Sequence, residues 1–228
     1  MNSLATNLNQ VMAESGFVVP SAYIGNTQQD VAQLVALSQA AAMEIVEGGW
    51  QQLRKIFSLT LTSATAYPLP TDFLGFISGT MYQNGRWDPV DMPTTPATWA
   101  LLKSISGQSS LPIRTRIIDG QFQIQSPVAN AVIQAEYNSN APITDSTGVT
   151  PKSIFTADSD LWILDDRLFQ LELKWRFKRE KGLEWQTDLQ DSASRRATVR
   201  ARDEGNSTII PNLVTISGQP YTNTWIST

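Results

Sequence analysis

The segment from Leu161 to Lys181 is the part of this sequence that most constrains the fold. Its apolar residues repeat at helical spacing, but they fall into two separate stripes instead of one. The first stripe holds Leu161, Leu164, Leu168, Leu171 and Trp175, and the second holds Trp162, Phe169, Leu173 and Phe177. A helix that is apolar on two faces can bury both only between two neighbours. We therefore expect this helix to be wedged between other helices.

Three more stretches show the signals of helices. Ser3 can cap a short helix that Gly16 stops, a second stretch runs from Gln28 or Asp30 to Glu47, and a last one covers residues 183–203. With the two-striped segment they predict a helical core domain made of residues 1–49 and 161–205.

The period of the apolar residues changes from 3.6 to 2 between residues 50 and 140. Short strands are expected at 57–62, 66–70, 76–82 and 131–137, with a short helix at 97–104. The Asp119-Gly120 pair in the middle of residues 114–125 is typical of a type I′ hairpin turn. We expect residues 50–140 to form an inserted, β-rich module.

The predicted fold class is therefore α+β. It is an α-helical bundle, with an N-terminal helix plus two long C-terminal helices, into which a small antiparallel β module is inserted. Residues 138–160 lack a period and predict an extended arm or loop, and residues 206–228 predict an extended C-terminal tail.

Two absences in the composition exclude much chemistry. The chain has 0 Cys and 0 His among 228 residues, so disulfides, thiolate nucleophiles, Cys/His zinc sites and Ser-His-Asp triads are excluded. No secretory signal or membrane span is recognisable. The net charge of -4 argues against a general nucleic-acid binder. We expect no cofactor and no metal.

The densest acidic groups are Asp165 with Asp166 and Asp158 with Asp160. They fit a metal or glycosidase pair, but acids at the start of a helix also complement its dipole, and we favour this second interpretation. If the chain were a hydrolase, Glu136 and Glu172 would be the carboxylates to test, since such an enzyme needs an acid of raised pKa.

Basic residues concentrate in the C-terminal helices. Of 17 Lys and Arg, ten lie between Arg167 and Arg202, where acidic residues alternate with them. This mixture favours ion pairs, within a helix or between subunits, over phosphate contacts.

Two blocks of the sequence resemble head-to-tail adaptor (connector) proteins of tailed bacteriophages, especially short-tailed ones. The C-terminal block combines Leu164-Asp-Asp-Arg-Leu168 with the Trp-rich and basic segment 173–182 and a Gly-Leu break. The N-terminal half adds an Ala-rich helix that ends near Gly48-Gly49-Trp50 and the segment Tyr67-Pro-Leu-Pro-Thr-Asp-Phe73. The resemblance covers residues 29–205.

This resemblance implies a structural virion protein at the junction of portal and tail, assembled in the host cytoplasm. The protein would form a ring, usually of about twelve copies, that docks under the portal protein and extends the DNA channel. It would receive the tail nozzle or tail tube, and double-stranded DNA would pass without specific binding. The residues we expect at subunit or portal interfaces are Arg167, Lys174, Arg176, Lys178, Arg179, Trp162, Phe169, Phe177, Tyr221 and Trp225.

Two other functions remain compatible with the sequence. A scaffold-like assembly factor would also lack catalytic residues, but it would be absent from finished virions. A virion-associated cell-wall hydrolase would need one of the two glutamates named above in a cleft.

Overall fold

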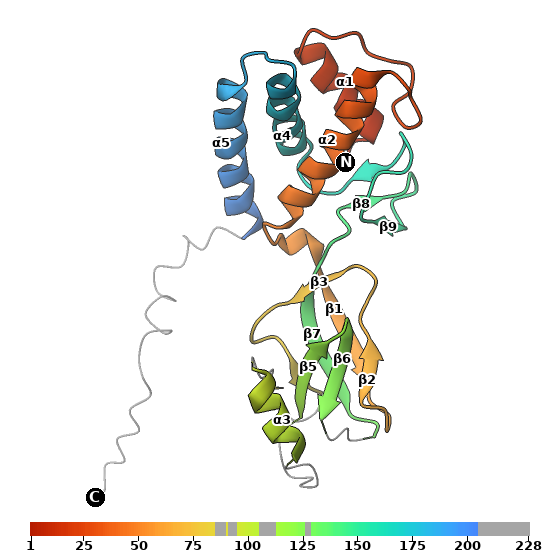
Figure 1. Cartoon of the computed structure of the whole chain (residues 1–228), viewed down its shortest axis with the longest axis vertical. Coiled ribbons are helices and arrows are strands. Elements are labelled where there is room, and N and C mark those ends of the chain that lie inside the picture. The colour runs from red at the N-terminus through yellow and green to blue at the C-terminus, as the bar shows by residue number, and fades with distance from the viewer. Residues whose placement is uncertain (85–89, 91–94, 105–112, 126–128, 205–228) are drawn as a thin grey trace, which may run out of the picture.

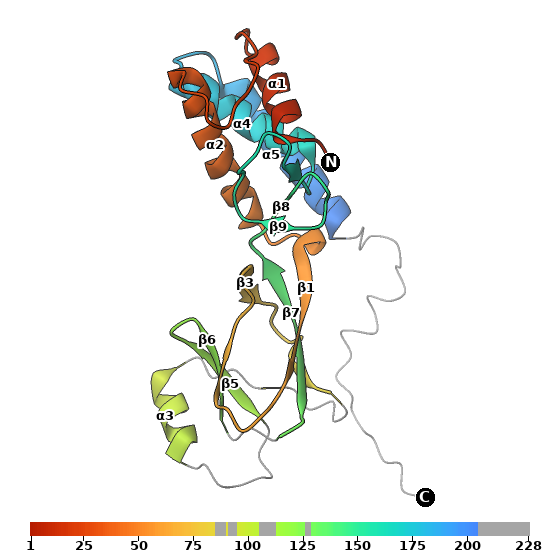
Figure 2. The same cartoon turned by 90° about the vertical axis from the view of Figure 1, so that its right-hand side faces the viewer.

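The computed structural model describes residues 1–84, 90, 95–104, 113–125 and 129–204 of the chain. The described residues form a helical part at one end and a β-rich part at the other, along the long axis of the molecule (Figures 1 and 2). None of the described helices is long and apolar enough to cross a membrane.

The helical part contains α1 (Leu4–Glu14), α2 (Gln29–Val46), α4 (Asp166–Glu180) and α5 (Gln186–Asp203). α4 contacts each of the other three, which confirms that this helix is wedged between neighbours. Its buried side chains make one core with α1 and α2, in which the rings of Trp162 and Phe169 stack at 4.7 Å. Ser3 caps α1 as expected, because its hydroxyl accepts a hydrogen bond from the Thr6 amide.

The predicted architecture of a bundle with a small β module is wrong. The described residues contain five α-helices and ten strands in three sheets, so strands are a major component of the fold. The C-terminal helices are also shorter than expected. Residues 161–162 form β10, and α4 begins only after Asp165, whose carboxylate caps it by accepting from the Leu168 amide.

Residues 138–160 are not an extended arm. They include β8 (Ile143–Thr144) and β9 (Pro151–Lys152), which form a three-stranded sheet with β10 (Leu161–Trp162) in the order β10-β8-β9. Ile143 is fully buried in the helical core. Turns and backbone hydrogen bonds hold this segment in place, including the one from the Leu4 amide to the Asp160 carbonyl at 2.8 Å. Such contacts do not require a regular spacing of apolar side chains, so the sequence shows no period here.

The β-rich part has two sheets and one helix. One sheet has the order β1-β7-β3, with β4 also paired to β7; the other has the order β2-β6-β5. The strands are β1 (Arg54–Thr60), β2 (Ala66–Pro68), β3 (Phe73–Phe76), β4 (Tyr82–Gln83), β5 (Arg114–Ile118), β6 (Gln121–Gln125) and β7 (Val132–Ser139), and the helix is α3 (Pro96–Ser104). The predicted 114–125 hairpin is confirmed: Asp119 and Gly120 have φ of 53° and 67°, as a type I′ turn requires.

A second hydrophobic core fills the β-rich part. Phe57, Phe76 and Phe122 pack edge to face, with ring centroids 5.4 to 5.5 Å apart. β7 alternates between faces, since Ile133 and Tyr137 are buried while Glu136 is exposed. The short 3-10 helix η1 (Gln51–Leu53) belongs to the first core, through its buried Leu53, and leads directly into β1.

Candidate functional site

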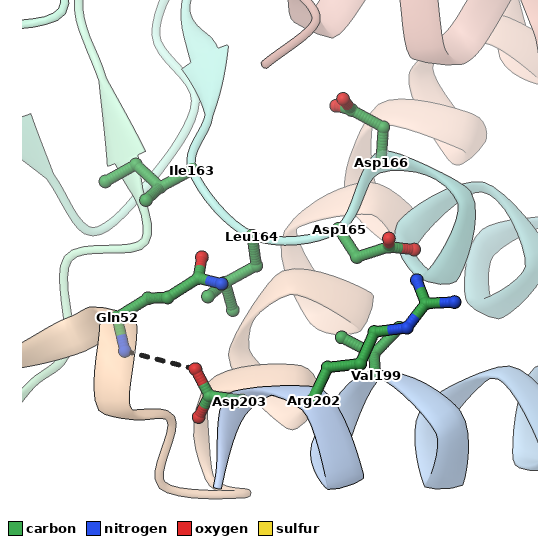
Figure 3. Close-up of a pocket in the computed structure, with 8 residues that line it drawn as sticks. All are labelled: Gln52, Ile163, Leu164, Asp165, Asp166, Val199, Arg202 and Asp203. Carbon is green, nitrogen blue, oxygen red and sulfur yellow. Dashed lines mark hydrogen bonds between the residues drawn. The ribbon is translucent and has the colours of Figure 1, made fainter. Parts of the chain in front are cut away.

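A pocket lies where the helical part meets the stem, the point at which β1 and β7 enter and leave the β-rich part (Figure 3). Its volume is about 380 Å³, and its walls come from η1, the start of α4 and the end of α5. The lining residues are Gln52, Ile163, Leu164, Asp165, Asp166, Val199, Arg202 and Asp203.

The carboxylates of this pocket are already engaged within the chain. Asp165 caps α4 and also accepts two hydrogen bonds from Arg195, at 2.9 and 2.6 Å. Burial alone would raise the pKa of Asp165, but the hydrogen bonds from Arg195 and the Leu168 amide lower it overall. Asp166 accepts from the Asn2 amide at 3.0 Å. These acids stabilise helix and chain ends, as the favoured interpretation predicted.

The other acidic pair is also structural. Asp158 accepts hydrogen bonds from the amides of Tyr23 and Ile24 at 2.9 and 2.8 Å. Asp160 accepts from Lys152 at 2.7 Å and from the Thr156 amide at 2.7 Å. In the part of the chain that the structure describes, no group of three or more acidic side chains is arranged to hold a metal ion.

A buried ionic network joins α4 to α2 and α5. Its centre is Glu172, which is 4% exposed and accepts hydrogen bonds from Arg176, Arg196 and the Trp175 indole. Arg176 also pairs with Glu44 on α2. Burial alone would raise the pKa of Glu172, but the hydrogen bonds from Arg176 and Trp175 lower it overall. A carboxylate held in its charged form is poorly suited to act as a general acid.

A second ionic cluster joins α4 to α1 and α5. Lys174 lies between Glu14 and Asp188, at 2.9 and 3.0 Å, and Asp188 also pairs with Lys178 at 2.5 Å. Arg167 adds a second cation to Glu14 at 2.7 Å. Across the two clusters, five cations and four acids therefore pair with one another inside one subunit.

A third polar group lies in the stem, where β1 and β7 enter and leave the β-rich part. Asp72 accepts hydrogen bonds from Lys55 on β1 and from Tyr137 and Ser139 on β7, at 2.6, 3.0 and 2.7 Å. Burial alone would raise its pKa, and these donors lower it overall. Asp72 belongs to the Tyr67–Phe73 segment on which the resemblance rests, so the structure gives that motif a physical role.

The charged side chains described above have structural partners within the chain, and the comparison with known families also gives a structural protein. The family model described as SU10 adaptor protein matches residues 6–212. The chain belongs to the SU10 adaptor protein family. It is thus a structural phage adaptor, and the recognition made from the sequence is confirmed. No curated protein matches the chain.

The adaptor-family chain uses most of the predicted interface residues internally. Trp162, Phe169 and Phe177 are 0% exposed, because the chain's own helices α1, α2 and α4 enclose them, so they leave no surface for a second subunit. Arg167, Lys174, Arg176 and Lys178 are in the ion pairs described above. Tyr221 and Trp225 lie outside the described residues.

Arg179 is one of the two exposed side chains among the predicted α4 cations, together with Arg167. It pairs with Glu180 at 3.2 Å and lies 5.1 Å from the centre of the Trp175 ring. The Trp175 side chain is only partly buried. Its ring centre lies 6.1 Å from that of Trp185, which is the N-cap residue of α5. This corner of the adaptor is a mixed aromatic and basic surface.

Sequence reasoning missed the acidic partners Glu14 and Glu44. Both lie more than 120 residues from the cations that they pair with, so no i, i+4 spacing revealed them. The available signal was their position on helices with few other charges. Glu136, the second glutamate considered for catalysis, lies on the exposed face of β7.

Proposed function

We propose that this phage adaptor forms a ring at the junction of portal and tail, where it extends the DNA channel and offers the attachment site for the tail. The observation that carries the proposal is the family match over residues 6–212. About twelve copies would make a closed cyclic assembly, and the chain would be a virion component.

The division of the chain supports a mechanical role. Residues 1–49 and 161–205 would be one domain, with residues 50–140 as an inserted module, because the buried residues from Phe57 to Tyr137 form a core of their own, while Trp50 and Leu53 belong to the helical core. Such a chain can present one end to the portal and the other to the tail. The low charged fraction of 17% fits a protein that buries further surface between subunits.

Because the α4 cations are neutralised within the subunit, ring contacts would come from other surfaces. Candidates are exposed apolar side chains in the connections between elements, such as Val18, Val149 and Leu183.

The native mass of the purified chain, alone and mixed with the portal ring of the same phage, tests the proposal. We expect a monomer that converts to a stoichiometric ring complex when portal is present. A chain that stays unbound in the mixture and is absent from finished virions would instead indicate an assembly factor.

A further inference from the structure

One edge of the sheet β1-β7-β3 is open. Leu61 donates its amide hydrogen to the Ala131 carbonyl at 2.8 Å, which fixes the phase of the β1–β7 ladder. In an antiparallel pair, successive residues alternate between facing the partner strand and facing away. The backbone groups of Ile56, Ser58 and Thr60 therefore point away from β7.

The opposite strand confirms this phase. Glu136, which is paired with Ile56 in the register, accepts at its carbonyl from the Ile77 amide at 2.9 Å, on the β3 side. Its amide likewise bonds to the Thr80 hydroxyl on that side at 3.0 Å. The backbone of Glu136 is thus turned away from β1, as the alternation requires.

Nothing among the described residues covers or blunts the β1 edge. The register from Arg54 to Thr60 is unbroken, without a bulge, and Ile56, Ser58 and Thr60 are all exposed. Ile56 is 73% exposed. Natural edge strands are usually protected by Lys, Pro, bulges or very short length, and the Ile56–Thr60 stretch has none of these.

The edges of the other sheet are protected in the usual ways. β2 is three residues long and ends in Pro68, and β5 carries Arg114 and Arg116. β1 carries charge only at its start, in Arg54 and Lys55, and Lys55 is paired with Asp72, so the Ile56–Thr60 stretch is the part of this edge suited to receiving a strand.

The sequence contains one segment with the composition to fill this edge. Residues 206–228 have no charged side chain, and they include two runs rich in β-branched residues, Ser207–Ile210 and Asn212–Ser217. Such residues favour strands, and the lack of charge removes any penalty for approaching the apolar side chain of Ile56.

The described chain ends close to the start of β1, shortly before this segment begins. Asp203, at the end of α5, accepts hydrogen bonds from the amides of Gln51 and Gln52 at 2.6 and 3.3 Å, just before β1 begins. A seven-residue strand is about 23 Å long, whereas the segment can span about 75 Å when extended. Tethering at this point gives the segment a high effective concentration at the edge.

We propose that residues 206–228 add a strand to the free edge of β1 in the same chain. The carbonyl and amide groups of Ile56, Ser58 and Thr60 bond to this strand, and the four-stranded sheet gains a fifth member. The pairing does not depend on ring formation, so it goes beyond the proposed function.

Amide hydrogen exchange measured by NMR on the full-length chain tests the pairing. The test variant carries Ile209→Pro and Val214→Pro, one proline in each β-branched run, because proline removes a ladder donor. The control variant carries Gln219→Pro, outside both runs. We expect the amides of Ile56, Ser58 and Thr60 to exchange roughly tenfold or more faster in the test variant than in the wild type or control.

The amides of Phe57 and Leu59 serve as internal controls, because they face β7 and should keep their protection in all three proteins. Equal exchange of the three edge amides in wild type and test variant would overturn the proposal. Protection that increases with protein concentration would also overturn it, because it would assign the strand to another copy of the chain.

Discussion

At the scale of single residues, Glu172 should be the most sensitive charged position of the helical core. Glu172→Gln removes the buried carboxylate from Arg176, which is buried, and from Arg196, which is half-buried, and leaves both with only Glu44 at the edge of the network. We expect a loss of about 3–5 kcal/mol in the free energy of unfolding, measured by urea denaturation. The control is Glu180→Gln, which removes an exposed pair with Arg179 and should cost under about 0.5 kcal/mol. Equal effects of the two variants would contradict the buried network.

Glu14 gives the stability of the protein a defined dependence on pH. Burial alone would raise its pKa, but hydrogen bonds from Arg167, Gln10 and Lys174 lower it from 4.5 to about 2. A lowered pKa means that the stabilisation is fully present above pH 4.5 and is lost as the pH falls towards 2. We expect the free energy of unfolding to fall less over this range in Glu14→Gln than in wild type. Parallel curves would show that Glu14 is not stabilised in its charged form.

At the scale of elements, the two aromatic positions of α4 should respond differently to truncation. Phe169 is 0% exposed and stacks on Trp162, so Phe169→Ala should cost about 3–5 kcal/mol in unfolding free energy. Trp175 is only partly buried, at the α4–α5 corner, and Trp175→Ala should cost about 1–2 kcal/mol. Thermal and urea unfolding check both values, and the reverse order would contradict the placement of α4.

The joint between α5 and η1 depends on the carboxylate of Asp203. Asp203→Ala leaves the amides of Gln51 and Gln52 without their acceptor and should cost about 1–2 kcal/mol. Faster exchange of these two amides is the specific readout. Glu204→Ala is the control, because Glu204 contacts only Arg200 on the exposed face of α5 among the described residues. Unchanged exchange in Asp203→Ala would mean that the joint is held by other contacts.

At the scale of the whole molecule, two separate cores predict partly independent unfolding. Phe122 is fully buried in the β core, where its ring packs against Phe57 and Phe76 of the same core. Phe122→Ala should therefore destabilise the β-rich part and leave exchange protection in α4 unchanged. Hydrogen exchange in mild denaturant distinguishes this outcome from global loss of protection, which would indicate a single cooperative unit.

Local sequence signals predicted the longer elements of the fold but not its short strands. Helices α1, α2 and α4 and the 114–125 hairpin follow from local periods and turn residues. The number of strands could not be predicted in this way, because β8, β9 and β10 are only two residues long and are fixed by backbone partners distant in the sequence. A two-residue strand has no period to detect.

For the candidate site, the sequence predicted the kind of interaction but not the residues that take part in it. The mixture of acids and bases on α4 indicated ion pairs, but their partners Glu14 and Glu44 come from helices far away in the sequence. Phe169 and Phe177 suggested an interface because a second apolar stripe needs a partner. The partner is the chain's own N-terminal helices, a choice that a pattern within α4 alone does not specify.

The stem gives the β-rich part a particular mechanical character. The chain enters through Arg54 and leaves through Asn138, which lie opposite each other in the β1–β7 register. A tension between the two ends of the molecule therefore pulls both strands in the same direction, and neither slides past the other. Asp72 clamps the two strands at this base. The load is shared by two covalent backbones, so a force transmitted along the molecule need not break the ladder.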